Sequence, residues 1–72
     1  MKRIATLRKE FRDGTVKFAE FVDTGHGNVR YIERVTWGDG AKNMSIQNGL
    51  SMEQAHKQIE LHKSMGYIEM GV

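Results

Sequence analysis

The stretch Val29-Arg-Tyr-Ile-Glu-Arg-Val-Thr-Trp37, followed by Gly38-Asp-Gly40 and then Ala41-Lys-Asn-Met-Ser-Ile46, decides the fold of this chain. Two alternating runs rich in β-branched and aromatic residues flank an aspartate bracketed by glycines. Glycine accepts the positive φ that a tight turn requires, so the pattern predicts a β-hairpin. Alternation along the first run directs Tyr31, Val35 and Trp37 to one face, where we expect them to be buried against the core.

A second hairpin is predicted at the start of the chain. An aspartate–glycine pair separates two further alternating runs, Ile4 to Phe11 and Thr15 to Val22. In the second of these runs the apolar residues change parity between Phe18 and Ala19. Either a β-bulge resets the register, or the strand is buried on one face and offers Phe21 on the other.

The run that follows Gly40 is predicted to be the fourth strand, with Met44 and Ile46 facing inward. Its polar side chains are expected to face outward; they are Asn43, Ser45 and Gln47. A helix should begin at Ser51, because Ser51 and Gln54 have the spacing of a capping box. Gly66 is expected to end this helix in the left-handed conformation.

The predicted order of four strands and then a helix indicates the α+β class. We expect a four-stranded antiparallel β-meander with one C-terminal helix packed on one face, and the residues from Tyr67 to Met70 could add a short final strand. A chain of 72 residues holds one small core, so residues 1–72 should form a single domain. The chain has no cysteine, and self-association into a homodimer is the expected further support.

The charge of the chain is mildly basic and unevenly distributed. The formal net charge is +2 and the pI is near 9.2, and every arginine lies at or before Arg34. The longest apolar runs fall well short of the roughly 18 residues that a membrane span needs, and the first residues do not resemble a signal peptide. We therefore expect a soluble, cytoplasmic protein without membrane attachment.

The sheet face that the helix leaves open is the predicted binding site. Arginine makes forked contacts with phosphate and stacks on bases, so cations beside apolar groups on a sheet favour nucleic acid, in particular single strands. Arg30 and Arg34 are the principal binding residues that we predict. The full set of candidate binding residues is Arg8, Lys17, Phe21, Arg30, Ile32 and Arg34.

One resemblance to a known family concerns the second half of the chain. Trp37-Gly38 ends a predicted strand, Ser51 to Ala55 opens the helix, and Gly66-Tyr67 closes it. These residues resemble the second half of a WGR domain, a module associated with nucleic-acid binding. Asp39 stands where that family has its arginine.

A second resemblance covers the last predicted strand and the start of the helix. Met44-Ser45-Ile46 leading to Met52-Glu53-Gln54 is similar to the corresponding part of the positive cofactor four family. Members of that family are single-stranded-DNA-binding coactivators that have four strands followed by a helix and that dimerise. The resemblance implies the same order of elements and the same class of ligand.

The sequence predicts a binding protein that is not an enzyme and needs no cofactor or metal. His56 and His62 are six residues apart, whereas a shared ligand face on a helix needs a spacing of three or four. The serines lie outside any nucleophile-elbow motif. The alternative hypothesis is a small viral or mobile-element inhibitor or adaptor that binds a host protein through a strand edge or a glycine loop.

Overall fold

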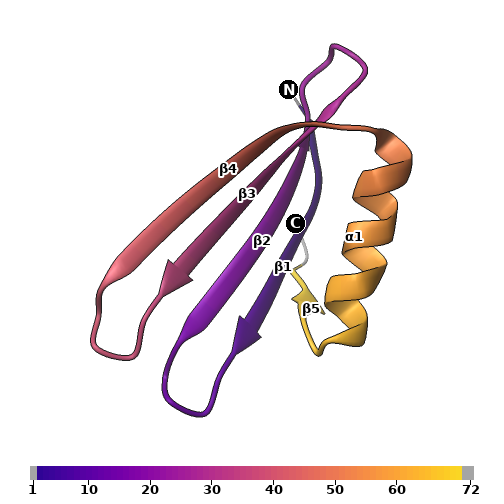
Figure 1. The fold of residues 1–72 in the computed structure, drawn as a ribbon. Helices are drawn as coiled ribbons and strands as arrows, with labels where there is room; N and C mark the ends of the chain where they lie inside the picture. The colour runs from indigo at the N-terminus through magenta and orange to yellow at the C-terminus, as the bar shows by residue number, and fades with distance from the viewer. Residues whose placement is uncertain (1, 71–72) are drawn as a thin grey trace.

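The computed structural model describes residues 2–70, which form one small domain. Its elements are β1 (Lys2–Glu10), β2 (Val16–Asp23), β3 (Val29–Thr36), β4 (Lys42–Leu50), α1 (Met52–Ser64) and β5 (Ile68–Glu69). The strands form one antiparallel sheet in the order β4-β3-β2-β1-β5 (Figure 1). The predicted α+β fold, a meander of four strands with one C-terminal helix and a short final strand, is confirmed.

The core lies between α1 and one face of the sheet. Small residues let the helix approach: Ala19 on β2 and Ala55 on α1 are both fully buried. Phe21 is also fully buried, and it packs against Tyr31 on β3 with the ring centroids 5.0 Å apart. The buried cluster consists of Ala5, Leu7, Ala19, Phe21, Val29, Ala55 and Ile59.

The capping box of α1 is present as predicted. Ser51 Oγ accepts a hydrogen bond from the Gln54 amide at 3.0 Å, and Gln54 Oε1 accepts one from the Ser51 amide at 2.9 Å. Gly66 follows the helix with a φ of 96°, which is the expected left-handed conformation. The start and the end of the helix are thus fixed by local chemistry.

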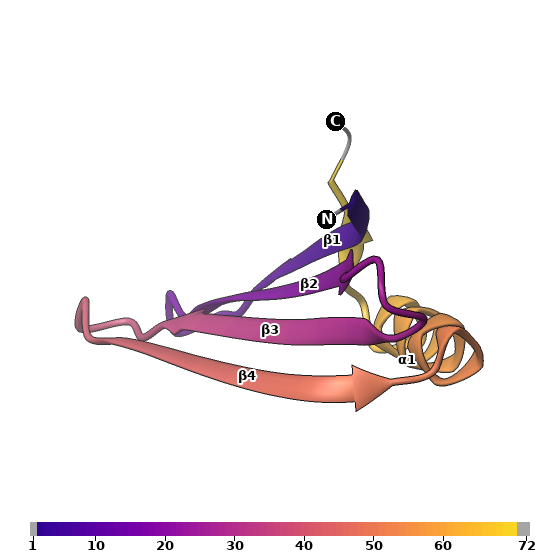
Figure 2. The same cartoon turned by 90° about the horizontal axis from the view of Figure 1, so that it is seen from above.

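The helix covers only one end of the sheet. Figure 2 shows α1 beside the end of the strands from which the chain enters it, while the other end, with the turns that join β1 to β2 and β3 to β4, has no helix beside it. Trp37 lies at this uncovered end and is 42% exposed, so the prediction that it is buried is wrong. With the Asn43 amide oriented to satisfy both of its neighbours, the Trp37 Nε1 donates to Asn43 Oδ1 at 3.1 Å.

The predicted orientation of β4 is also wrong. The amide of Trp37 donates to the carbonyl of Ala41 at 2.7 Å, which makes a three-residue loop and pairs Arg34 with Met44 and Ile32 with Ile46. This register directs Met44 and Ile46 away from the helix. The polar residues of β4 face the helix side instead and are exposed there; they are Asn43, Ser45 and Gln47.

The two turns at the uncovered end have the same design. In each, an aspartate Oδ1 accepts the backbone amide two residues later: Asp13 from Thr15 and Asp39 from Ala41, both at 2.9 Å. The turns also touch, because a Cβ on Gly38 would lie 2.3 Å from the carbonyl oxygen of Asp13. Glycine is therefore required at position 38 to bring the two hairpins together.

Candidate functional site

The open face is the side of the sheet opposite α1. Along each strand it takes every second residue, and the strand register aligns these residues in rows across the sheet. One row crosses all five strands and has Phe18 at its centre. We call it the central row; it consists of Met44, Arg34, Phe18, Arg8 and Ile68.

Phe18 lies between two arginines in the central row. It pairs with Arg8 on β1 and with Arg34 on β3, and the Arg8 Cζ is 6.0 Å from the centre of the Phe18 ring. The ring is half-buried by these neighbours but has no helix above it. An apolar ring between two arginine residues can stack on a planar ligand while the arginines hold the negative charge of that ligand.

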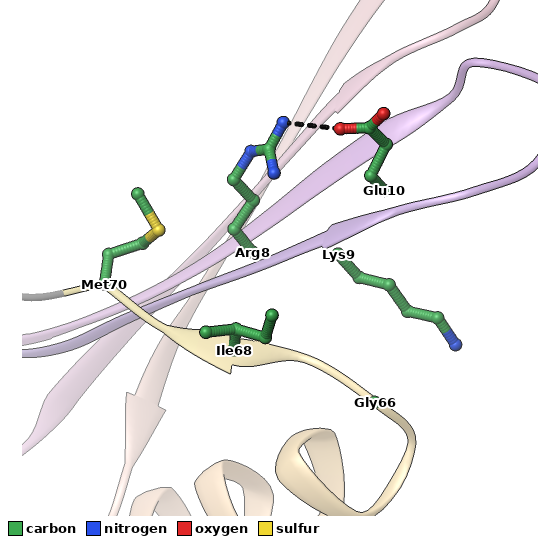
Figure 3. A pocket seen from close by; sticks show the side chains of 6 residues that line it. All are labelled: Arg8, Lys9, Glu10, Gly66, Ile68 and Met70. Carbon is green, nitrogen blue, oxygen red and sulfur yellow. Dashed lines mark hydrogen bonds and ion pairs between the residues drawn. The ribbon is translucent and has the colours of Figure 1, made fainter.

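Two shallow hollows lie along the central row. One has a volume of about 350 Å³ and combines the Phe18 ring with the cations of Arg34 and Lys42. The other has a volume of about 340 Å³ and lies at the opposite edge, where β5 meets β1. Figure 3 shows its lining: Arg8 and Glu10 point to one side of β1, Lys9 points to the other, and Ile68 on β5 and Met70 just after β5 lie beside them.

The charge of the open face is positive. Register assigns five cations and two acids to it: Arg3, Arg8, Arg30, Arg34 and Lys42 against Glu10 and Glu20. The acids form ion pairs with arginines, Arg8 to Glu10 at 3.0 Å with both side chains exposed, and Arg34 to Glu20 at 3.8 Å with the Glu20 side chain only 18% exposed. The exposed pair between Arg8 and Glu10 is weak. A guanidinium has five N–H donors, so both arginines keep donors for an anionic ligand.

The structure brings four of the six predicted site residues together. Arg8, Arg30, Arg34 and Ile32 all lie on the open face. Arg30 is anchored there because its Nε donates to Asn48 Oδ1 at 2.8 Å.

The other two predicted site residues lie elsewhere. Lys17 pairs with Lys9 and Val35 on the helix side, where its ammonium is 5.4 Å from the Phe11 ring. Phe21 is buried beneath the helix and has no contact with solvent. Phe21 could not be assigned from the sequence because β2 is apolar on both faces, and the covered face is the one that also carries Ala19.

Phe18 and Lys42 complete the open face and were not predicted as site residues. The signal for Phe18 was its alternation, since it points to the same side as the arginines that pair with it on both neighbouring strands. The face on which Lys42 lies depends on the length of the loop before it, because that length determines which side of the sheet the even-numbered residues of β4 occupy. Lys42 could therefore be predicted as a site residue only from the loop length.

A cluster of polar groups lies on the helix side and joins α1 to β3. The Tyr31 hydroxyl donates to Glu33 Oε2 at 2.9 Å and is 3.4 Å from Nε2 of the buried His62. The His62 Nδ1 is 2.6 Å from the Gln58 carbonyl oxygen, so Nδ1 carries a proton and donates it to that carbonyl. Burial, and then the hydrogen bond to Glu33, raise the pKa of the Tyr31 phenol well above its ordinary value. These contacts hold the helix in place.

Two further properties concern residues 2–70 as a whole. Their histidine and acidic side chains do not gather into a group of three or more that could hold a metal ion. In the same range, the helix is too short and too polar to cross a membrane. A scan against protein-family models, a search of curated proteins and a search of solved structures found no match for this chain.

Proposed function

We propose that this protein binds single-stranded nucleic acid on the open face of its sheet. The observation that carries the proposal is the position of Phe18 between Arg8 and Arg34 on a face that no helix covers. The excess of cations on this face attracts a phosphate backbone. A phenyl ring can stack on any unpaired base, and each such stack contributes about 1–3 kcal/mol by alanine substitution.

The binding mode follows from the central row. A base stacks on Phe18 in the hollow beside it, and Arg34 and Lys42 at its rim contact the phosphates on either side. Arg8 meets the next phosphate across β1. Unpaired bases are required, because bases within a duplex cover both of their faces by stacking and cannot reach a ring on a sheet.

The test is a fluorescence-anisotropy titration with labelled single-stranded DNA and RNA at several salt concentrations. Phe18→Ala should weaken binding roughly 5- to 150-fold, which is the loss of one stacked base. Arg34→Gln should also lower the salt slope by about 0.7, because one phosphate contact is removed.

The matched control is Lys57→Gln on the exposed helix surface, since it removes the same charge from the opposite side of the molecule. It should leave affinity nearly unchanged. Two results would contradict the proposal: no salt-sensitive binding at micromolar protein, or an equal loss of affinity in Lys57→Gln and Arg34→Gln.

A second candidate function is supported by the apolar margins of the open face. Met44 and Ile46 on β4 are 63% and 51% exposed, and Ile68 and Met70 at the other edge are 71% and 44% exposed. Exposed apolar groups of this size are typical of protein-binding surfaces. We therefore keep the alternative of a small inhibitor or adaptor that binds a host protein. It predicts that Met70→Ser abolishes capture of a partner protein, whereas nucleic-acid binding through the central row, to which Met70 does not belong, should survive this substitution.

A further inference from the structure

Within residues 2–70, the outer edge of β4 is a long strand edge without a partner strand. β4 is the first strand in the sheet order, and within residues 2–70 only β3 pairs with it. It spans nine residues, of which eight are exposed, and Lys42 is its one charged side chain. Natural sheets protect such edges with charges, prolines or very short strands. Besides the charge of Lys42, β4 has only a register shift near its C-terminal end, between Gln47 and Leu50, so the edge from Lys42 to Gln47 is regular and open.

The opposite edge of the sheet is protected. There the last strand, β5, has only two residues, and its Glu69 forms an ion pair with Lys63 at 2.9 Å. A short, charged strand is a poor template for further pairing. The two edges therefore differ, and β4 is the edge that is suited to receive another strand.

The backbone groups that β4 presents can be identified from its hairpin. The Trp37 amide bonds to the Ala41 carbonyl, and bonded pairs alternate along an antiparallel ladder. Ser45 therefore bonds to β3. The N–H and C=O groups of Met44 and Ile46 point away from the sheet, toward a strand that would lie beside β4.

We propose that β4 pairs antiparallel with β4 of a second copy, about a two-fold axis at Ser45, so that the two sheets become continuous. In this register Met44 and Ile46 of one copy exchange hydrogen bonds with Ile46 and Met44 of the other. Asn43 lies opposite Gln47 of the second copy. Apolar groups thus meet apolar groups on one face, and amides meet amides on the other.

Other two-fold registers match less well. An axis at Met44 places Lys42 opposite Ile46 of the second copy, and an axis at Ile46 places Met44 opposite Asn48. With the axis at Ser45, Lys42 of each copy pairs with Asn48 of the other copy. The two Lys42 ammonium groups are therefore kept apart. Pairing about Ser45 is therefore the self-complementary arrangement.

The two-fold axis stands perpendicular to the sheet, as it must when identical strands pair antiparallel. Both open faces then lie on one side of the dimer, and both helices lie on the other. This interface does not depend on what the open face binds, so it can be tested on its own.

The decisive experiment uses single cysteines, because the natural chain has none. In Ser45→Cys the two thiols meet at the axis as a non-hydrogen-bonded pair, whose Cα atoms are about 4.5 Å apart and within disulfide range. Mild oxidation should give a covalent dimer. The control is Asn43→Cys, equally exposed and on the same face; its two thiols lie four residues out of register, roughly 13 Å apart along the strand, and should not cross-link.

A second measurement follows association without cross-linking. Sedimentation equilibrium should show a concentration-dependent dimer, which Ile46→Pro converts to a folded monomer because it removes an outward N–H without breaking a bond to β3. Ile46→Ala, which keeps that N–H, should still dimerise. A wild-type chain that stays monomeric at millimolar concentration would overturn the proposal, and so would equal cross-linking of Ser45→Cys and Asn43→Cys.

Discussion

Two phenylalanines on β2 show how position decides the role of a residue. Phe18 and Phe21 are three residues apart, so alternation directs them to opposite faces. Phe21 fills the core beneath α1, whereas Phe18 occupies the centre of the open face. The same side chain therefore serves stability at one position and, in our proposal, binding at the other.

This division predicts different costs for the two truncations. Phe21→Ala should lower the free energy of unfolding by about 3–5 kcal/mol, because it empties a fully buried site. Phe18→Ala should lower it by less than about 2 kcal/mol, since the ring is only half-buried. Urea denaturation followed by circular dichroism measures both. Equal losses would contradict the assignment of faces.

The hydroxyl of Tyr31 predicts a loss of stability at high pH. The native protein keeps this phenol protonated above its ordinary pKa of 10.0, so the unfolded chain releases the proton first. The contribution to the free energy of unfolding is complete below pH 10 and should decrease as the pH rises above it.

The comparison that isolates this effect is between the wild-type chain and Tyr31→Phe. Denaturant titrations between pH 9 and pH 11.5 should show a shallower decline in the variant, which has no hydroxyl at position 31. If the two curves run parallel, the hydrogen bond between Tyr31 and Glu33 does not hold the proton in solution.

Among the elements, α1 depends on its first turn more than on its sequence propensity. The helix has 13 residues, a length that is marginal for a helix in isolation. Its capping box satisfies two backbone amides that otherwise lack partners in the helix.

Ser51→Ala should therefore lower the free energy of unfolding by about 1 kcal/mol. Ser64→Ala is the matched control at the other end, where the hydroxyl only donates to the Leu61 carbonyl, and it should cost less. Thermal unfolding of both variants measures the difference. A Ser64→Ala variant as unstable as Ser51→Ala would mean that the cap has no special role.

The strands show which parts of the structure were predictable from the sequence. The turns at Gly14 and Gly40 and the cap at Ser51 were predictable because each depends on neighbours within a few residues. The alternation of Arg30, Ile32 and Arg34 was predictable for the same reason.

The faces of the larger apolar residues depended on distant geometry. Trp37, Met44 and Ile46 were expected inward because they are large and apolar. Trp37 lies at the end of the sheet that the helix does not cover, and the register of β4 directs Met44 and Ile46 to the open face. Which face of β2 is buried depended on where α1 would lie, and both faces offered apolar groups. The side on which a short helix packs is not encoded in the strand that it covers.

At the scale of the whole molecule, the coverage by one short helix predicts uneven local stability. Residues of β2 lie in the middle of the sheet and beneath α1, whereas β4 is exposed along nearly its whole length. Segments with few buried contacts open locally at a lower free energy than the global unfolding reaction.

Hydrogen exchange measured by NMR in dilute protein should show this difference. The amide of Phe21 should exchange only through global unfolding, and the amide of Ser45, which bonds to β3, should exchange through local opening. Equal exchange free energies at the two positions would indicate that β4 is as stable as the core strands. The comparison must use dilute protein, because pairing of two β4 strands would slow exchange at Ser45.

Because the two hairpin turns touch, replacing the sequence of one turn by that of the other should be tolerated in one direction only. The two loops close their hairpins with the same hydrogen bonds; they are Arg12-Asp13-Gly14 and Gly38-Asp39-Gly40. Judged by these hydrogen bonds alone, either loop sequence could replace the other. Arg12→Gly leaves the contact between the turns intact, whereas in Gly38→Arg the side chain clashes with the carbonyl oxygen of Asp13. Among variants in which these loops are exchanged, the one with glycine at position 12 should therefore fold, and the one with arginine at position 38 should not.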